Sequence, residues 1–300
     1  MRIVHVDTGR ELRGGQRQVL LLLQSLRAAG EDCTLLARAG SPLFQTAGKA
    51  GFPVYPVGLQ SLRKHSEKAD LIHAHDARAH TQAAIAARVP FVVSRRVAFP
   101  LKRGLLSQWK YRQAKRYLAV SQFVAAELGR SGITQDKIDV VYDGVETNIQ
   151  TEWCAQNPAV ALASRDPAKG RDLVEEAARI AGIRISFSDD LSRDLTAASV
   201  FIYITRSEGL GSAALLAMAM GVPVIASDVG GLPEVLGYGD AGFLTPNDAS
   251  KIAAAIKLLR DDSALAQTLI ERGKIRVAEH FTAQRMLDHT LASYRRALAV

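Results

Sequence analysis

The chain has 300 residues, a formal net charge of +8 and an apolar share of 48%. This length exceeds one ordinary hydrophobic core and predicts two domains of about 150 residues each. The cysteines are Cys33 and Cys154, which are far apart, so we expect reduced thiols in a cytoplasmic protein rather than a secreted disulfide scaffold. The N-terminus turns polar too early for a signal peptide, and the apolar runs are too short or too broken to span a bilayer. We therefore expect a soluble or peripheral protein.

The first half of the chain alternates short β-branched runs with helical stretches. We expect strands at residues 2–6, 33–37, 71–74, 91–94, 117–120 and 138–141, and helices at 16–29, 81–88 and 122–130. Strands that alternate with helices form a parallel sheet covered on both faces, so the first half predicts an α/β domain.

The same pattern restarts after a break at residues 143–158, which is rich in Asn, Gln and Glu. We expect strands at 160–163, 183–187, 200–204 and 224–226, and helices at 170–180, at 212–220 and from 249 to the end. The pattern predicts two doubly wound, Rossmann-like domains at 1–150 and 151–283, with a terminal helix at 284–300 packing back towards the first. Such domains bind ligands at the carboxyl ends of their strands, which predicts a site in the cleft between them.

A basic segment spans residues 77–126, which contain no Asp or Glu. Its ten cationic residues are Arg78, Arg88, Arg95, Arg96, Lys102, Arg103, Lys110, Arg112, Lys115 and Arg116. Large apolar side chains are interleaved with them: Phe99, Leu105, Leu106, Trp109 and Tyr111. A basic amphipathic surface of this kind suits an anionic membrane interface, although a merely solvated helical face gives the same pattern. No recognition motif supports nucleic acid as the partner.

The most informative stretch is the glycine-rich loop at residues 207–211, which is followed by an apolar helical run, a β-branched run and a second glycine-rich loop at 230–234. The loop contains Glu208, and the backbone N–H groups of Gly209, Leu210 and Gly211 come at the start of a helix. A helix N-terminus attracts anions because its N–H groups are free and its dipole is positive there.

Two further segments suit phosphate. Gly14 and Gly15 follow the first strand and open the first long helix, where a plain turn is the alternative interpretation. Residues 164–170 follow the first strand of the second domain and contain Arg165 and Lys169. Both cations can neutralise a phosphate, and the long Arg165 side chain presents a planar fork to it.

His73 and His75 stand at a strand end, and alternation places both side chains on one side of the strand. A metal site needs a third ligand, and the spacing marks none. No Asp-x-Asp motif stands at a strand end, so no catalytic metal and no cofactor are expected. The alternative for either histidine is a structural role in the core.

Together these motifs resemble the retaining GT-B glycosyltransferases of family 4, the glycosyl transferases group 1, over nearly the whole chain. The resemblance implies that Glu208 holds hydroxyls of the transferred sugar, that Lys169 and Arg165 neutralise the diphosphate, and that His75 lines the reaction face. It assigns catalysis to His75, Glu208 and Lys169, and nucleotide-sugar binding to Gly14, Gly15, Arg165, Lys169, Glu208, Gly209, Leu210 and Gly211.

The chain departs from this family's pattern at four points. Leu216 stands where the family has a second Glu that holds the ribose, Arg165 comes one residue late, and the region between Gly170 and Val200 is short. Leu216 and the shortened region lie at the nucleoside end of the site, so the base preference cannot be read. Asp143 also replaces the family's usual Asn at the domain join.

The resemblance implies an enzyme that moves a sugar from a nucleotide-diphosphate sugar to a lipid-linked or cell-envelope glycan acceptor. It would be cytoplasmic and peripheral on the inner face of the membrane. The alternative is a degenerate module that binds sugar nucleotide or membrane without turnover. The expected membrane or acceptor surface consists of Arg95, Arg96, Lys102, Arg103, Trp109 and Lys110.

Overall fold

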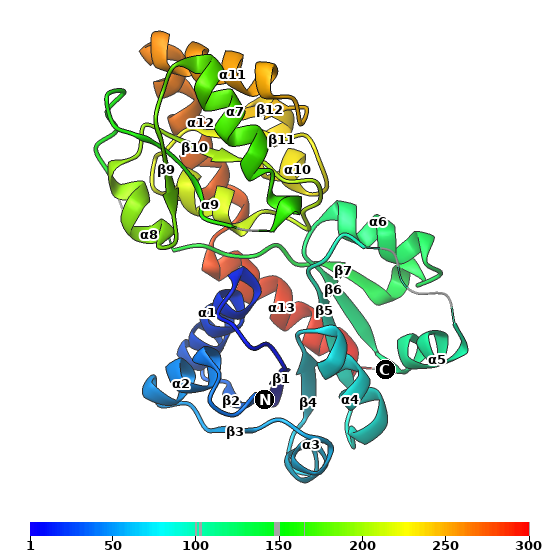
Figure 1. Ribbon diagram of the computed structural model, residues 1–300. Helices are drawn as coiled ribbons and strands as arrows, with labels where there is room; N and C mark the ends of the chain where they lie inside the picture. Colours follow the sequence, from blue (N-terminus) through cyan, green and yellow to red (C-terminus); the bar gives the residue numbers. More distant parts are fainter. Residues whose placement is uncertain (100, 102–103, 147–150, 165, 300) are drawn as a thin grey trace. The chain divides into compact units, whose positions relative to one another are not determined.

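The computed structural model describes residues 1–99, 101, 104–146, 151–164 and 166–299. Two compact units form over this part of the chain (Figure 1). The N-terminal unit comprises Met1–Gly144 and Ala283–Val300, and the C-terminal unit comprises Val145–Thr282. The boundary follows Gly144, where we had predicted the break after residue 150, and residues 283–300 fold with the N-terminal unit.

In the described residues, the N-terminal unit has a parallel sheet of seven strands in the order β3-β2-β1-β4-β5-β6-β7. The strands are β1 (Arg2–Asp7), β2 (Asp32–Ala37), β3 (Val54–Pro56), β4 (Leu71–Ala74), β5 (Phe91–Arg95), β6 (Arg116–Ala119) and β7 (Ile138–Val140). In the register between β1 and β4, His5 lies opposite His73. Neighbouring residues of adjacent parallel strands share a face, so this register brings two imidazoles together.

The helices of this unit are α1 (Gly14–Ala28), α2 (Pro42–Lys49), α3 (Leu59–Ser66), α4 (Ala77–Ala86), α5 (Leu105–Gln113), α6 (Gln122–Arg130) and α13 (Ala283–Leu298). Asp76 and Ser121 cap α4 and α6 by accepting hydrogen bonds from first-turn N–H groups. The N-cap residue of α1, Arg13, makes no such bond. The first turn of α1 therefore keeps N–H groups available to an anion.

Helix α13 joins the C-terminal end of the chain to the N-terminal unit, where it runs beside α1 (Figure 1). The Tyr294 side chain is fully buried in a core built from α1, α2, α13 and the sheet. The carboxylate of Asp139 accepts hydrogen bonds from Arg116, from Ser293 Oγ at 2.7 Å and from Arg296 at 2.7 Å. Burial opposes ionisation of Asp139, but these hydrogen bonds outweigh it and lower the pKa. These hydrogen bonds connect α13 to β6 and β7.

In the described part of the C-terminal unit, five parallel strands follow the order β12-β11-β10-β8-β9. They are β8 (Ala159–Leu162), β9 (Ile185–Ser188), β10 (Val200–Tyr203), β11 (Val224–Ser227) and β12 (Phe243–Thr245). The helices are α7 (Arg171–Ala181), α8 (Leu191–Asp194), α9 (Ser212–Ala219), α10 (Leu232–Val235), α11 (Ala249–Asp261) and α12 (Ser263–His280). Apolar side chains of α7 and α11 pack with those of the sheet into one core.

The predicted class, α/β with two Rossmann-like domains, is confirmed by these two parallel sheets. Every strand predicted from its β-branched run is present within about two residues, the usual uncertainty of an element boundary. The prediction missed β3 and β12, which have three residues each and are flanked or ended by proline. It also missed α2, α3 and α5 as elements of the first unit. None of the helices in the described residues is both long and apolar enough to cross a membrane.

Candidate functional site

In the C-terminal unit, Glu208 and Lys169 meet at the carboxyl end of the sheet. Lys169 ends a single 3₁₀ turn (Pro167–Lys169) after β8, and Glu208 lies in the loop between β10 and α9. The Lys169 Nζ atom lies 2.9 Å from Glu208 Oε2, and Gly209 N–H donates to Glu208 Oε1 at 3.1 Å. The structure therefore brings together the two residues that the motifs assigned to sugar and phosphate.

Tyr203 was not singled out by its sequence context. It is the last residue of β10, it is buried, and its hydroxyl donates to the same Glu208 Oε2 atom. Burial and the nearby Glu208 carboxylate raise the pKa of the Tyr203 phenol well above its usual range. Tyr203 is therefore a permanent hydrogen-bond donor at neutral pH.

The two glycine-rich loops pack backbone against backbone. Gly231 N–H donates to the carbonyl of Glu208 at 3.2 Å. A Cβ atom at Gly231 would lie 2.3 Å from the carbonyl oxygen of Gly209, and one at Gly230 would lie 1.9 Å from that of Glu208. Larger residues cannot approach so closely, so the second loop needs glycine in order to hold the first one in place.

Gly209, Leu210 and Gly211 lead directly into α9, whose N-cap residue Gly211 has a positive φ of 110° and forms no side-chain cap. The start of α9 lies at the same end of the sheet as Glu208, and the positive end of the helix dipole there suits an anion. Leu216 lies half-buried on α9 and supplies no carboxylate there. Arg165 lies outside the described residues, so its expected contact stays a prediction.

A network of buried hydrogen bonds connects the loops at the carboxyl end of this sheet. Thr205 N–H donates to Ser227 Oγ at 2.9 Å, Ser227 Oγ lies 2.6 Å from Asn247 Oδ1, and Asn247 Nδ2 donates to the Thr205 carbonyl at 3.0 Å. Thr205 Oγ1 also donates to the Ala168 carbonyl at 3.1 Å. The network links the carboxyl ends of β10, β11 and β12 to the turn that carries Lys169, so it fixes the relative positions of the loops.

In the N-terminal unit, three buried histidines lie together at the sheet. The rings of His73 and His75 have centroids 3.9 Å apart, which confirms that they share one side of the strand. His5 stacks on His75 with centroids 5.2 Å apart and interplanar angle 8°. Burial lowers the pKa of His5 to about 3 and lowers those of His73 and His75 well below their usual range. All three rings are therefore neutral at physiological pH.

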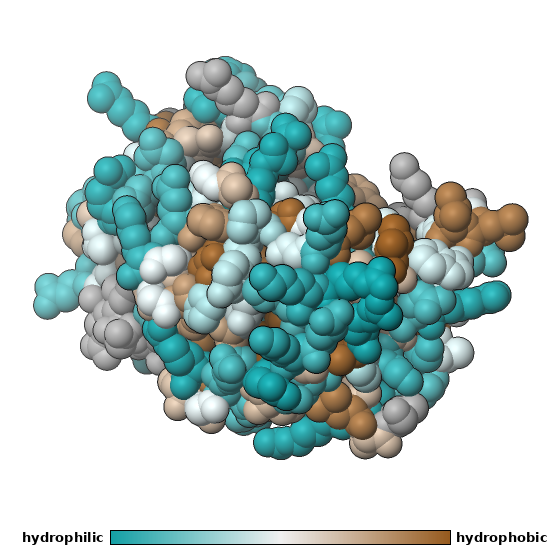
Figure 2. Space-filling view, turned by 90° about the horizontal axis from the view of Figure 1, so that it is seen from below, coloured by the Kyte–Doolittle hydropathy of each residue, from teal (hydrophilic) through white to brown (hydrophobic). Residues whose placement is uncertain are grey.

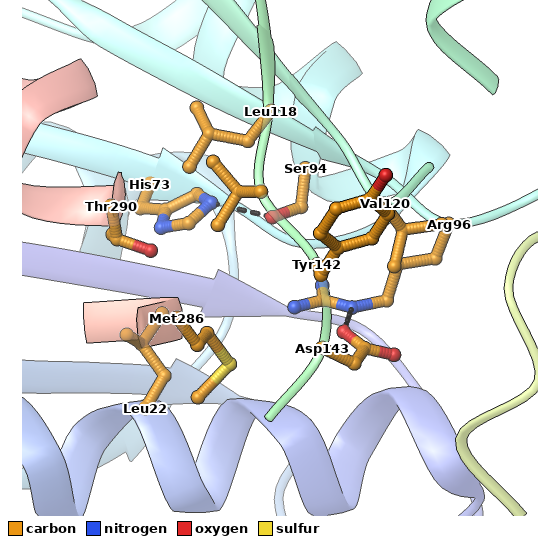
Figure 3. Close-up of a pocket in the computed structure, with 11 residues that line it drawn as sticks. Leu22, His73, Ser94, Arg96, Leu118, Val120, Tyr142, Asp143, Met286 and Thr290 are labelled. Carbon is orange, nitrogen blue, oxygen red and sulfur yellow. Dashed lines mark hydrogen bonds and ion pairs between the residues drawn. The ribbon is translucent and has the colours of Figure 1, made fainter. Parts of the chain in front are cut away.

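Nearly all the ring nitrogens of these histidines already have protein partners. His73 bonds Ser94 Oγ at 2.7 Å and Tyr294 OH at 2.6 Å, and Figure 3 shows the first of these contacts. His5 Nδ1 lies 2.9 Å from His75 Nε2, while His5 Nε2 has no partner among the described residues. His5 was not foreseen as a third imidazole, because it comes 68 residues before His73 in the chain. One nitrogen from each of the three rings lies within 4.8 Å of the others, but a metal ion would have to displace these hydrogen bonds.

Arg96 contacts both His75 and Asp143, which lies next to the unit boundary after Gly144. Its NH1 atom lies 3.5 Å from His75 Nδ1, and its Nε donates to Asp143 Oδ1 at 3.1 Å, the contact drawn in Figure 3. Only 17% of the Arg96 side chain is exposed. We had grouped Arg96 with the cations of a membrane or acceptor surface, but its ion pair with the buried Asp143 turns it inwards. A small cavity lies beside this pair, lined by Leu22, His73, Ser94, Arg96, Leu118, Val120, Val141, Tyr142, Asp143, Met286 and Thr290.

Gly14 and Gly15 form the first turn of α1, close to Arg96: a Cβ atom at Gly15 would lie 3.8 Å from Arg96 Cδ. Asp7, the buried last residue of β1, accepts hydrogen bonds from Gly9 N–H and from Gln16 Nε2. Burial raises the pKa of the Asp7 carboxyl group. No sequence motif marked Asp7, which adds a buried carboxyl group at the carboxyl end of β1.

Helix α5 presents the amphipathic part of the basic segment. Leu105 and Leu106 are 86% and 83% exposed, and Phe99 and Trp109 also lie on the surface. Figure 2 shows hydrophobic side chains protruding at the right-hand edge, on the side where α5 lies in Figure 1. Arg95 donates to the Phe99 carbonyl, and Lys110 Nζ lies 5.1 Å from the ring centroid of Tyr111. Lys102 and Arg103 lie outside the described residues.

Comparison with known proteins places these features in a family context. A family model described as "Glycosyltransferase Family 4" matches residues 12–149, and one described as "Glycosyl transferases group 1" matches residues 128–262. The chain is 37% identical to alpha-maltose-1-phosphate synthase of Mycobacterium tuberculosis over 112 residues, which are 35% of this chain and 29% of that protein. It is 29% identical to the MMP alpha-(1->4)-mannosyltransferase of Mycolicibacterium hassiacum over 228 residues, which are 63% of this chain and 56% of that protein. The chain thus spans well under two thirds of the length of either relative.

Among solved structures, the chain is similar to Anabaena Alr3699/HepE in complex with UDP-glucose. The TM-score is 0.85 at 18% sequence identity, and the match covers 98% of this chain and 100% of that one. At this identity the likeness shows a shared fold.

Proposed function

The chain belongs to glycosyltransferase family 4, the glycosyl transferases group 1, and on that premise we propose that it transfers a hexosyl group from a nucleotide-diphosphate sugar to a glycan acceptor. The observation that carries the proposal is the Lys169–Glu208 pair beside the start of α9. An ammonium group and the positive end of a helix dipole suit a diphosphate, and a carboxylate suits the hydroxyls of the attached sugar.

We further propose that transfer retains the anomeric configuration. The bond between the anomeric carbon and the phosphate oxygen breaks, and the acceptor oxygen bonds to that carbon on the same face. The departing phosphate oxygen takes the acceptor's proton. Lys169, Arg165 and the N-terminus of α9 stabilise the charge that develops on the phosphate, which is the largest contribution that such a site can make. His75 is neutral, because burial holds its pKa low, so we assign it no proton transfer in this step.

Titration of the purified protein with UDP, GDP and ADP, and with a sugar conjugate of each, tests the binding half of this proposal. Glu208→Ala and Lys169→Ala should each weaken the preferred nucleotide sugar by about 10-fold to 100-fold, because a hydrogen bond to a charged group contributes about 1.5–3 kcal/mol. Glu175→Ala, which removes an exposed partner of Arg171 on α7, is the matched control and should bind normally. Binding to none of these nucleotides would contradict the assignment.

The acceptor is proposed to be lipid-linked, with α5 resting on an anionic membrane surface. Exposed Leu105 and Leu106 beside Lys110 and Arg112 combine the apolar and cationic contacts that such a surface offers. The protein should bind phosphatidylglycerol-containing vesicles more than pure phosphatidylcholine vesicles, and the excess should fall with salt. Leu105→Ser with Leu106→Ser should remove that binding, whereas Ile275→Ser, at another exposed apolar position, should not. Binding that ignores anionic lipid would leave α5 a solvated surface helix.

A degenerate binding module is the second candidate. Leu216 in place of a ribose-binding carboxylate favours it, as does the shortened region between Gly170 and Val200. Incubation of a labelled nucleotide sugar with membrane extract separates the two candidates. Transfer of the label to extractable lipid or glycan, lost in Glu208→Ala, supports the enzyme; tight binding without transfer supports the module.

A further inference from the structure

Tyr203 and Lys169 share one oxygen atom of Glu208 but differ in how firmly they are held. Both donate to Glu208 Oε2, and Lys169 Nζ also lies 3.5 Å from the Tyr203 hydroxyl. Tyr203 stands on β10, is 6% exposed and stacks on Phe201 with ring centroids 5.7 Å apart. Lys169 ends a single 3₁₀ turn and its side chain is 28% exposed. The tyrosine is therefore the rigid partner of the carboxylate and the lysine the adjustable one.

A sugar diphosphate would attract Lys169 but leave Tyr203 on Glu208. A diphosphate attracts the Lys169 ammonium group more strongly than the single carboxylate does, because it carries more charge. When Lys169 turns to the phosphate, Glu208 keeps the Tyr203 hydroxyl on Oε2 and its own Gly209 N–H on Oε1. The remaining lone pairs of the carboxylate then face the sugar hydroxyls with an orientation already set.

We propose that Tyr203 is a positioning residue that holds Glu208 in place for the sugar while Lys169 neutralises the phosphate. This role rests on the proposed function, since it assumes that Glu208 receives the sugar. The hydroxyl of Tyr203 stays protonated across the physiological range because burial and Glu208 raise the pKa of the phenol. Tyr203 therefore remains able to donate to Glu208 throughout this range.

The test compares the affinities for a nucleoside diphosphate and for its sugar conjugate, measured by isothermal titration calorimetry. Tyr203→Phe keeps the ring and removes the hydroxyl. We expect it to weaken binding of the sugar conjugate about 10-fold, as for the loss of one charge-assisted hydrogen bond. The affinity for the diphosphate should change by less than about 2-fold. Lys169→Met should weaken both ligands. Tyr238→Phe, which removes an exposed hydroxyl in the same unit, is the control and should change neither.

A double-mutant cycle identifies the residue through which Tyr203 acts. In a Glu208→Gln background, Tyr203→Phe should cause less than about a 2-fold further loss for the sugar conjugate, because the charged acceptor is gone. Equal weakening of both ligands by Tyr203→Phe, or no change in either, overturns the positioning role. Tyr203→Leu provides the same comparison if the Phe variant does not fold. Wild-type protein that binds no nucleotide sugar overturns the proposed function and this role with it; wild-type binding with an unchanged Tyr203→Phe overturns this role alone.

Discussion

His5 and His75 share a hydrogen bond inside the N-terminal unit, and the proton in it can be assigned from the neighbouring Arg96. His5 Nδ1 lies 2.9 Å from His75 Nε2, and Arg96 NH1 approaches His75 Nδ1 at 3.5 Å. A guanidinium group only donates, so His75 Nδ1 accepts and its proton resides on Nε2. His5 Nδ1 then accepts from His75, which leaves the His5 proton on Nε2.

The first prediction concerns these tautomers. Long-range ¹⁵N–¹H NMR spectra of the imidazoles should show both His5 and His75 protonated at Nε2. Arg96→Met should redistribute the His75 proton between its nitrogens, because the obligatory donor is gone. Arg95→Met is the control, since Arg95 contacts the Phe99 carbonyl and not the histidines. An Nδ1–H signal for His75 in the wild-type protein would contradict the assignment.

The second prediction concerns acid stability and uses His80, a buried histidine outside the candidate site. Burial lowers its pKa to about 3, from 6.5 for an exposed histidine. Between these values the unfolded chain binds a proton that the folded protein does not, so stability falls as the pH drops from 6.5 towards 3. Each such histidine contributes a slope of about 1.4 kcal/mol per pH unit. Urea denaturation of His80→Phe at several pH values should show a free energy of unfolding that changes less steeply with pH, by this amount. His289→Phe, which replaces a histidine on helix α13, serves as the comparison.

The third prediction concerns the contact between the glycine-rich loops. Gly231→Ala should lower the free energy of unfolding by about 1–3 kcal/mol, because its Cβ would overlap the carbonyl of Gly209 and displace the loop. Nucleotide-sugar affinity should fall with it, since the loop carries Glu208. Gly48→Ala, at a helical position in α2 with open space around it, should be neutral or stabilising by about 0.5–1 kcal/mol. Normal melting and binding of Gly231→Ala would show that the loops can separate freely.

The fourth prediction concerns Leu216, which stands half-buried on α9 where the resemblance expects a second Glu. Leu216→Glu should tighten binding of the preferred nucleotide about 10-fold if the ribose reaches this position, as a charge-assisted hydrogen bond does. Leu216→Gln, which matches the shape without the charge, should gain less. Calorimetric titration measures both. Unchanged affinity in Leu216→Glu would mean that the nucleoside is held elsewhere.

The local pattern of the chain was enough to predict the long elements. Runs such as the one that forms β10 are short, apolar and rich in β-branched and aromatic residues, and the regular alternation with helical stretches indicates a parallel α/β sheet. Glu208 and Lys169 could be proposed as site residues from the sequence, because both stand in short motifs whose residues are close in sequence. The brief β3 and β12 were missed because three residues carry too little pattern to predict a strand.

What the sequence determined alone is therefore the α/β class and the identity of the loop residues, since both depend on neighbours within a few positions. The tertiary structure decided which distant side chains meet. His5 reaches His75 through the register of β1 and β4, Arg96 turns inwards through Asp143, and Tyr203 reaches Glu208 because β10 ends beside the loop. These contacts depend on strand pairing and burial, which bring together residues that no local spacing connects.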